Sequence, residues 1–252
     1  MDLIEYRRSA PERARVKDLM ALVPKPVEFA LDVGARDGFI SRQLTRHSAW
    51  VTALDLEEPR IEHERIRCVQ GDVTALSFSD ASFDLVLCSE VLEHIPGREL
   101  HSACSELGRV AKRYILVGVP YKQDIRFGRT TCRSCGHANP PWGHVNRFDE
   151  LRLKKLFPDF DVVKTTFVGS SDADTNFVSS ALMDLAGNPY GTYSQDEPCT
   201  HCGSTLQPPP ERHLWQKVFT RLAFLTRSVQ KPFIKPHANW IHMLLKKRSR
   251  TH

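Results

Sequence analysis

The sequence predicts an α/β protein whose core is a parallel β-sheet. Short apolar runs alternate with stretches of helical spacing over residues 27–168, which is the order of elements in consecutive βαβ units. A glycine-punctuated turn follows the first apolar run, and acidic residues end the next two. Because the carboxyl ends of parallel strands meet at one edge of a sheet, these residues also predict a ligand pocket at that edge.

The first strand and its turn organise the rest of the chain. Residues 29–33 form an apolar run interrupted by Asp32, residues 34–38 form the turn, and helical spacing resumes at Phe39. Gly34 and Gly38 carry no Cβ, so backbone can approach a ligand closely, and the following helix aims its first amides at that ligand. We therefore expect a nucleotide-type pocket formed by Asp32, Gly34, Ala35, Arg36 and Gly38.

Three further strands are predicted at residues 50–56, 68–72 and 82–88. The second strand ends in Asp55, about twenty residues past the turn, where a carboxylate accepts both hydroxyls of a ribose. The third ends in Asp72, placed to accept the amino group of an adenine. We expect Leu56, Val73 and Ser89 to line the same pocket.

The remaining elements complete a seven-stranded sheet. Helices are predicted at residues 99–111 and 148–157, and strands at 114–120 and 160–168. Residues 177–185 are expected to pair with the last of these as an antiparallel seventh strand. A helix within residues 2–23, ended by Pro24 and Pro26, is expected to cap the pocket or to pack against the sheet edge.

This order of strands, glycine turn and acidic residues resembles the class I S-adenosylmethionine-dependent methyltransferases over residues 27–168. The resemblance implies a Rossmann-like fold, S-adenosylmethionine as the cofactor and methyl transfer as the reaction. A cofactor-binding scaffold without catalytic activity is the alternative. One departure is Arg36, where the family has a glycine, and it implies a tighter or shifted turn.

An acidic and histidine cluster follows the fourth strand. Glu90, Glu93 and His94 point to one side if Glu90 begins a helical turn, and that side faces the methyl end of the cofactor. The pattern resembles those of ubiquinone-biosynthesis and plant-type small-RNA O-methyltransferases, which implies a divalent-metal site with His144 as an added ligand. Mg²⁺, Mn²⁺ or Zn²⁺ there would lower the pKa of a substrate hydroxyl. In the alternative, His94 alone is the general base and His144 orders the entrance loop.

Four of the seven cysteines form two Cys-x-x-Cys pairs, Cys132/Cys135 and Cys199/Cys202. Each pair is a tight turn that presents two corners of a tetrahedral zinc site, and a set of four thiolates leaves no open coordination position. We therefore expect a structural Zn²⁺ that supports two irregular insertions, residues 121–146 and 196–206, and shapes the substrate entrance. His137 and His201 are alternative ligands. The other three cysteines stand singly in apolar surroundings as buried fillers.

Charge separates the C-terminal segment from the rest. Residues 211–252 hold five arginines and five lysines against one glutamate, a balance of +9, whereas the whole chain carries +5 and residues 1–210 therefore carry −4. Two amphipathic helices are predicted here, around Trp215 and Trp240. They dock on the body or on a second subunit, or they bind an anionic membrane surface; RNA binding ranks third.

These observations give a layout and a function. The layout is an N-terminal cap helix at residues 1–26, a methyltransferase domain at 27–210 and a basic amphipathic tail at 211–252. No run approaches the roughly 18 apolar residues of a membrane span and no signal-peptide core is present, so we expect a cytoplasmic protein, peripheral on the inner face of the membrane. The expected reaction is O-methylation of a small molecule, a sugar or a lipid-linked glycan; the rival is RNA 2′-O-methylation. The methyl acceptor and the oligomeric state stay open.

Overall fold

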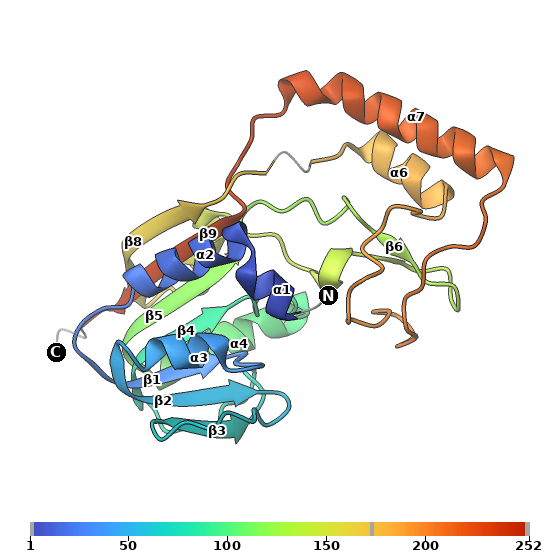
Figure 1. Cartoon of the computed structure of the whole chain (residues 1–252). Coiled ribbons are helices and arrows are strands. Elements are labelled where there is room, and N and C mark those ends of the chain that lie inside the picture. Colours follow the sequence, from blue (N-terminus) through green and yellow to red (C-terminus); the bar gives the residue numbers. More distant parts are fainter. Residues whose placement is uncertain (1–2, 172–173, 250–252) are drawn as a thin grey trace. The chain divides into compact units, whose positions relative to one another are not determined.

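The computed structural model describes residues 3–171 and 174–249, and the chain divides into two units (Figure 1). The sheet unit comprises Arg7–Tyr121, Phe148–Gly169 and Ala238–His252. The cysteine unit comprises Met1–Tyr6, Lys122–Arg147 and Ser170–His237. Each unit is therefore assembled from separate stretches of sequence.

The sheet unit contains the predicted seven-stranded sheet. The strand order is β3-β2-β1-β4-β5-β9-β8. The first five strands in this order run parallel, and β9 runs antiparallel to both of its neighbours. The strands are β1 (Val27–Val33), β2 (Ser48–Asp55), β3 (Ile66–Gln70), β4 (Phe83–Ser89), β5 (Ala111–Pro120), β8 (Phe160–Val168) and β9 (Trp240–Lys247). The expected α/β architecture with one antiparallel strand is confirmed.

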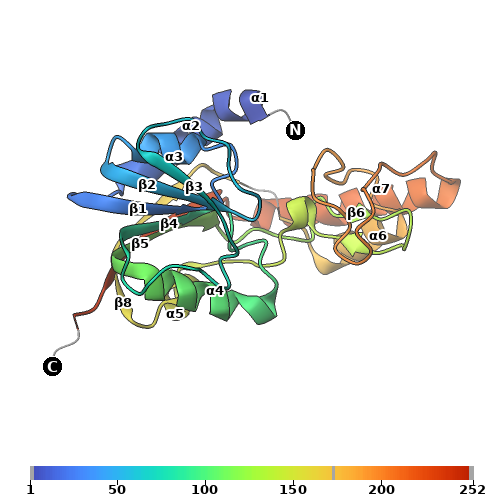
Figure 2. The same cartoon turned by 90° about the horizontal axis from the view of Figure 1, so that it is seen from below.

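Helices cover both faces of this sheet (Figure 2). On one face lie α2 (Ala10–Ala21) and α3 (Phe39–Leu44), and on the other lie α4 (Gly97–Val110) and α5 (Glu150–Leu156). Each face has its own buried apolar cluster, because the central strands are apolar on both sides. α1 (Leu3–Arg8) precedes α2 and is separated from it by Ser9, whose hydroxyl accepts the Glu12 amide as an N-cap.

The identity of the antiparallel strand differs from the prediction. Phe177–Leu185 is not a strand but helix α6, capped by Asn176, whose side chain accepts the Ser179 amide at 2.7 Å. The strand is Trp240–Lys247, which we had expected to be an amphipathic helix. Its central residues are buried on both faces of the sheet. A short continuous apolar run of this kind has no period that separates strand from helix.

The cysteine unit contains little regular structure besides two helices. α6 and α7 (Leu214–Gln230) pack together, with the Ser179 hydroxyl donating to the Ala223 carbonyl at 2.9 Å. The other elements are the hairpin β6 (Thr130–Thr131) and β7 (Ala138–Asn139) and two 3₁₀ turns, η1 (Pro141–Gly143) and η2 (Lys231–Phe233). No helix among residues 3–171 and 174–249 combines the length and the apolar character that a bilayer crossing needs.

Candidate active site and cysteine cluster

The glycine turn lies between β1 and α3, as predicted. Gly34 and Gly38 have φ angles of 78° and 75°, and Arg36 also has a positive φ of 47°. Arg36 therefore adopts the left-handed conformation that glycine takes without strain, and the turn is kept despite the substitution. The Gly34 amide donates to the Leu54 carbonyl at 2.8 Å. A Cβ on Gly34 would lie 2.3 Å from Val91 Cγ2, so this glycine also admits the loop after β4.

Asp55 holds this turn in place. One carboxylate oxygen accepts the Arg36 amide at 2.7 Å, and the other accepts the Leu56 amide at 2.7 Å. Each oxygen retains a lone pair for a further donor, such as a ribose hydroxyl. At the end of β3, Asp72 Oδ1 accepts both the amide and the hydroxyl of Thr74 at 2.8 Å.

Asp32 is buried within β1, just before the turn. Its Oδ2 accepts the Ser41 hydroxyl at 2.5 Å. Burial is the main cause that raises the pKa of Asp32 to about 7, with the negative charge of Asp55 acting in the same direction. This carboxyl is therefore poised to change protonation near neutral pH.

The acidic and histidine cluster lies in a hydrogen-bonded turn after β4. The His94 amide donates to the Val91 carbonyl at 3.0 Å, and α4 begins only at Gly97, so Glu90 does not begin a helix. Glu90 Oε2 accepts Trp240 Nε1 at 3.2 Å. Within the described ranges, Glu90 Oε1 and both carboxylate oxygens of Glu93 are buried without a hydrogen-bond partner.

Burial raises the pKa of both Glu90 and Glu93. The shift places Glu93 well above its usual range, because the neighbouring Glu90 charge adds to the cost of desolvation. A buried carboxylate is favoured in its protonated form or beside a cation, because an uncompensated negative charge is costly away from water. The pair therefore suits either acid–base chemistry or a divalent metal.

A layer of polar side chains beneath α2 was not predicted. Arg15 is buried, pairs with Glu12 at 2.7 Å and donates to the Ser89 hydroxyl at 2.8 Å. His242 Nδ1 lies 2.7 Å from Asp18 Oδ2, and burial lowers the pKa of the imidazole. The sequence signal was present, since Glu12, Arg15 and Asp18 follow each other at intervals of three residues in a helix.

His144 belongs to the cysteine unit, whereas the other predicted catalytic residues belong to the sheet unit. It is buried, and its Nδ1 donates to Gln123 Oε1 at 2.6 Å. This hydrogen bond selects the tautomer in which Nε2 carries the lone pair. The joint site of His144 with Glu90, Glu93 and His94 remains a prediction.

The four paired cysteines come together within the cysteine unit. Cys132 Sγ lies 3.7 Å from Cys202 Sγ, Cys135 Sγ lies 3.7 Å from Cys199 Sγ, and all four sulfur atoms lie within 4.8 Å of one another. A tetrahedron with metal–sulfur bonds of about 2.3 Å has edges of about 3.8 Å. The cluster therefore has the dimensions of a four-thiolate metal site.

The two cysteine turns have the same backbone design. The Gly136 amide donates to the Cys132 carbonyl and the Gly203 amide to the Cys199 carbonyl, both at 2.9 Å. Both glycines have positive φ angles, 73° and 71°. Asn139 ties the two turns together, because its Oδ1 accepts the Thr200 amide at 2.8 Å. The rings of His137 and His201 stack with centroids 5.5 Å apart.

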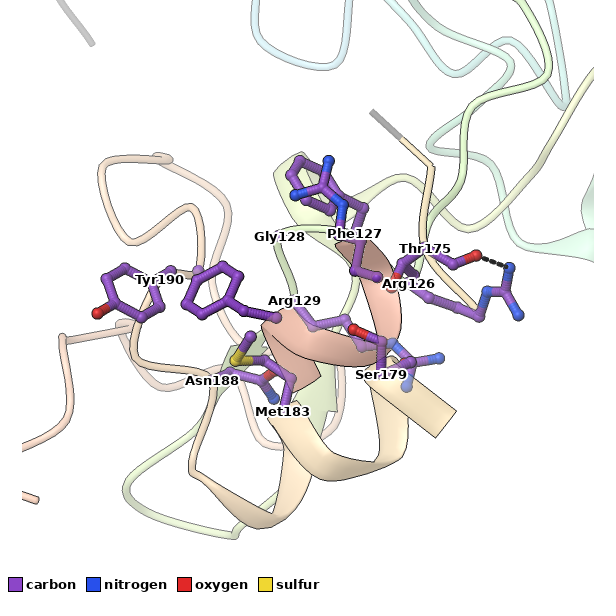
Figure 3. Close-up of a pocket in the computed structure, with 13 residues that line it drawn as sticks. Arg126, Phe127, Gly128, Arg129, Thr175, Ser179, Met183, Asn188 and Tyr190 are labelled. Carbon is purple, nitrogen blue, oxygen red and sulfur yellow. Dashed lines mark hydrogen bonds between the residues drawn. The ribbon is translucent and has the colours of Figure 1, made fainter. Parts of the chain in front are cut away.

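A cavity of about 100 Å³ lies beside α6 and α7 in the cysteine unit (Figure 3). Its wall includes Phe127, Met183 and Tyr190, together with the side chains of Arg126 and Arg129. Both of these arginines form ion pairs within the unit, Arg126 with Asp124 at 2.8 Å and Arg129 with Asp184 at 2.9 Å. Arg227 also lines the cavity and lies over the Phe127 ring, so the wall is largely apolar and includes three arginines.

Part of this chain is similar to known methyltransferases. Residues 31–114 match the family described as a methyltransferase domain. An uncharacterized methyltransferase of Mycobacterium tuberculosis is 33% identical over 133 residues, which cover 48% of this chain and 66% of the relative. A malonyl-[acyl-carrier protein] O-methyltransferase of Erwinia pyrifoliae is 38% identical over 133 residues, covering 51% and 47%. A ubiquinone biosynthesis O-methyltransferase of Xanthomonas campestris is 36% identical over 92 residues, covering 32% and 38%. The chain thus spans just under two thirds of the mycobacterial relative and less than half of the other two.

Solved structures share the fold. A putative methyltransferase from Bacillus halodurans has a TM-score of 0.57 at 16% identity, with 93% of this chain and 99% of that chain covered. The N-methyltransferase NodS from Bradyrhizobium japonicum, solved with S-adenosyl-L-homocysteine, has a TM-score of 0.52 at 20% identity, covering 68% and 85%. The sheet order, the glycine turn and these matches together show that the chain carries a class I S-adenosylmethionine-dependent methyltransferase domain.

Proposed function

We propose that the protein transfers the methyl group of S-adenosylmethionine to a hydroxyl of a small molecule, a sugar or a lipid-linked glycan. The observation that carries this proposal is the turn of residues 90–95, which holds two buried carboxylates and an imidazole beside the glycine turn. The two turns adjoin, because β4 pairs with β1 and Val91 fills the space above Gly34. Two relatives are named O-methyltransferases, which supports an oxygen acceptor.

The residues of the glycine turn fit the cofactor. Asp55 has lone pairs directed away from the two amides that it accepts, and these suit the ribose hydroxyls. Asp72, at the end of β3, is the proposed partner of the adenine amino group, with Leu56 and Val73 as apolar walls. Arg15 and Ser89 lie at the carboxyl end of β4, where the methionine part of the cofactor would extend. When bound, the cofactor supplies an electrophilic methyl group.

His94 is the proposed general base. Its imidazole would accept the proton of the acceptor hydroxyl while the oxygen attacks the methyl carbon in line. Glu93, whose pKa is raised by burial, would orient the hydroxyl. In the metal-assisted version, Glu90, Glu93, His94 and His144 would hold Mg²⁺ or Mn²⁺, and the two carboxylates would then be ionised.

The four cysteines are the proposed ligands of a structural Zn²⁺. Their spacing suits a tetrahedral four-thiolate site, in which all four cysteines bind the metal as thiolates. Such a site has no open position for substrate. Its role would be to hold the cysteine unit in the shape that receives the acceptor.

Transfer of labelled methyl groups into fractionated cell extract tests the function. We expect label in the lipid or glycan fraction; label in RNA would support RNA 2′-O-methylation, and no label would support a cofactor-binding scaffold. His94→Ala should lower transfer about 100-fold while calorimetry shows unchanged cofactor affinity. Glu99→Gln, in the first turn of α4, is the matched control.

The metal-assisted version makes a separate prediction. Activity of wild type should then rise with added Mg²⁺ or Mn²⁺, and Glu93→Gln and His144→Ala should abolish that response. An identical rate with and without metal in all three proteins would remove the divalent metal from the mechanism.

A further inference from the structure

Helix α7 carries a stripe of exposed apolar side chains along its whole length. Leu214, Trp215, Leu222, Leu225 and Val229 are between 43% and 73% exposed. With 100° between successive residues of an α-helix, these five side chains fall within an arc of about 100°. A continuous apolar arc of this width is what a helix normally buries.

The opposite face of α7 is the one that the cysteine unit uses. Thr220 and Ala223 are buried there. The Ala223 carbonyl accepts the Ser179 hydroxyl, and the Thr226 carbonyl accepts Asn176 Nδ2 at 3.2 Å, so α6 packs on this side (Figure 1). The apolar stripe therefore takes no part in the packing of α7 against α6.

The charges beside the stripe have a single sign. Residues 214–230 contain no aspartate or glutamate, and Lys217 and Arg221 are exposed along one border of the arc. After the helix, Phe233 is 83% exposed between Lys231 and Lys235. An apolar arc with tryptophan and a cationic border is the composition of a helix that lies in the plane of an anionic membrane surface.

A second copy of the chain is a poorer occupant of this face. Two copies that bury the stripe with their α7 helices antiparallel would bring the cationic borders together, and like charges across an interface oppose association. Farther along the tail, Lys247 is engaged by the sheet unit, since its Nζ donates to the Gly108 and Ala111 carbonyls, both at 2.8 Å.

We infer that the exposed face of α7, with residues 231–235, binds in the plane of an anionic phospholipid surface. The leucines, Trp215 and Phe233 enter the boundary between headgroups and acyl chains, and the lysines and arginines contact lipid phosphates. That this contact delivers a membrane-borne acceptor to the methyltransferase domain rests on the proposed function. The binding itself does not.

Co-sedimentation of the full-length protein with vesicles tests this inference. We expect binding to phosphatidylcholine vesicles that contain phosphatidylglycerol, at least about tenfold weaker binding to pure phosphatidylcholine, and loss of binding as salt rises. Leu222→Asp/Leu225→Asp should lower binding at least about tenfold without changing the melting temperature. Leu151→Asp, at an exposed leucine of α5 in the sheet unit, should bind as wild type does.

Two outcomes would overturn the inference. One is a full-length protein that ignores both kinds of vesicle, including the case in which light scattering shows a dimer that Leu222→Asp/Leu225→Asp converts to a monomer. The other is unchanged vesicle binding by that double variant. Methyl transfer in the vesicle-free extract assay, with cofactor binding by calorimetry, reports on the proposed function independently, so either idea can fail alone.

Discussion

The sheet unit and the cysteine unit are held together by different means. In the sheet unit, apolar clusters on both faces of the sheet bury large side chains such as Leu19, Leu85 and Phe148. Among the described residues of the cysteine unit, the buried apolar cluster comprises Cys132, Cys199 and Leu206, with Tyr193 packed against it, and a cavity lies beside the two helices. Because apolar burial supplies most of the stability of a fold, the cysteine unit needs another source, and the four sulfur atoms are placed to provide it.

Removing the proposed metal should have the largest effect on the difference between the two units. We expect a chelator, or the double substitution Cys199→Ser/Cys202→Ser, to unfold the cysteine unit, because structural zinc contributes on the order of 10 kcal/mol to small folds. The sheet unit should remain folded and continue to bind cofactor, since its clusters contain none of these cysteines. Limited proteolysis with mass spectrometry measures the first effect, and calorimetry with S-adenosylmethionine measures the second.

Cys68→Ser serves as the control, because Cys68 lies outside the four-sulfur set, on β3 in the sheet unit. It should show the proteolytic pattern of wild type. Metal-free protein whose residues 122–147 and 170–237 stay as resistant as before would contradict the proposed zinc role.

A substitution at Gly34 should have the next largest effect, and it falls on the sheet unit. In Gly34→Ala, the new Cβ would lie 2.3 Å from Val91 Cγ2, at a φ of 78° that costs a non-glycine residue about 1–2 kcal/mol. We expect a loss of about 2–4 kcal/mol in unfolding free energy and a fall of at least about 100-fold in cofactor affinity. Urea unfolding and calorimetry measure the two quantities.

The double variant Gly34→Ala/Val91→Ala separates the two roles of this glycine. Removing the valine methyl groups relieves the clash, so stability should recover in part. Cofactor affinity should stay low if backbone at Gly34 approaches the cofactor directly. Full recovery of affinity would show that Gly34 serves only to admit Val91.

The parallel strands could be predicted because each carries its own signal. Val27–Val33 and Phe83–Ser89 are apolar runs bounded by turn residues, and their partners lie nearby in the sequence. The antiparallel strand could not, because Trp240–Lys247 joins β5 and β8 from a distance of more than 70 residues. Its apolar pattern fits a helix as well as a strand. The segment forms a strand because β5 and β8 leave a position between them that a strand can fill.

The candidate site was predictable where backbone geometry dictates residue type. The glycine turn and Asp55 carry such a signal, and so do the cysteine pairs with their following glycines. No pattern in the sequence links the residues from the two ends of the chain that meet beneath α2. Asp18 meets His242 only because β9 lies between β5 and β8, next to the face that α2 covers.

The sheet unit contains buried ionisable groups such as Asp32. Its apolar burial is large enough to offset the free energy that they cost. The pKa of Asp32 is about 7, above the 3.8 of an unfolded chain. A carboxyl whose pKa is raised by folding destabilises the fold increasingly as pH rises from 3.8 to 7. Asp32→Asn keeps an acceptor for the Ser41 hydroxyl and carries no charge. We expect the cofactor-free variant to be more stable than wild type by about 2 kcal/mol at pH 5 and about 4 kcal/mol at pH 8.

Urea unfolding at the two pH values checks this prediction. An advantage of the same size at pH 5 and pH 8 would mean that Asp32 does not titrate in this range. Glu64→Gln, at an exposed glutamate shortly before β3, is the control for a general change of charge.

A substitution at His242 should have the smallest effect on stability. Its pH dependence should be opposite to that of the substitution at Asp32. Its imidazole is fully buried, Nε2 lacks a hydrogen-bond partner among the described residues, and burial lowers the pKa below 6.5. The unfolded chain therefore binds a proton before the folded chain does, and wild type loses stability as pH falls below 6.5. His242→Gln removes this titration, so the unfolding free energy of the variant should fall less than that of wild type between pH 7 and pH 5. His101→Gln, at an exposed histidine of α4, should follow wild type, and a variant at position 242 with the wild-type slope would assign the acid sensitivity to another group.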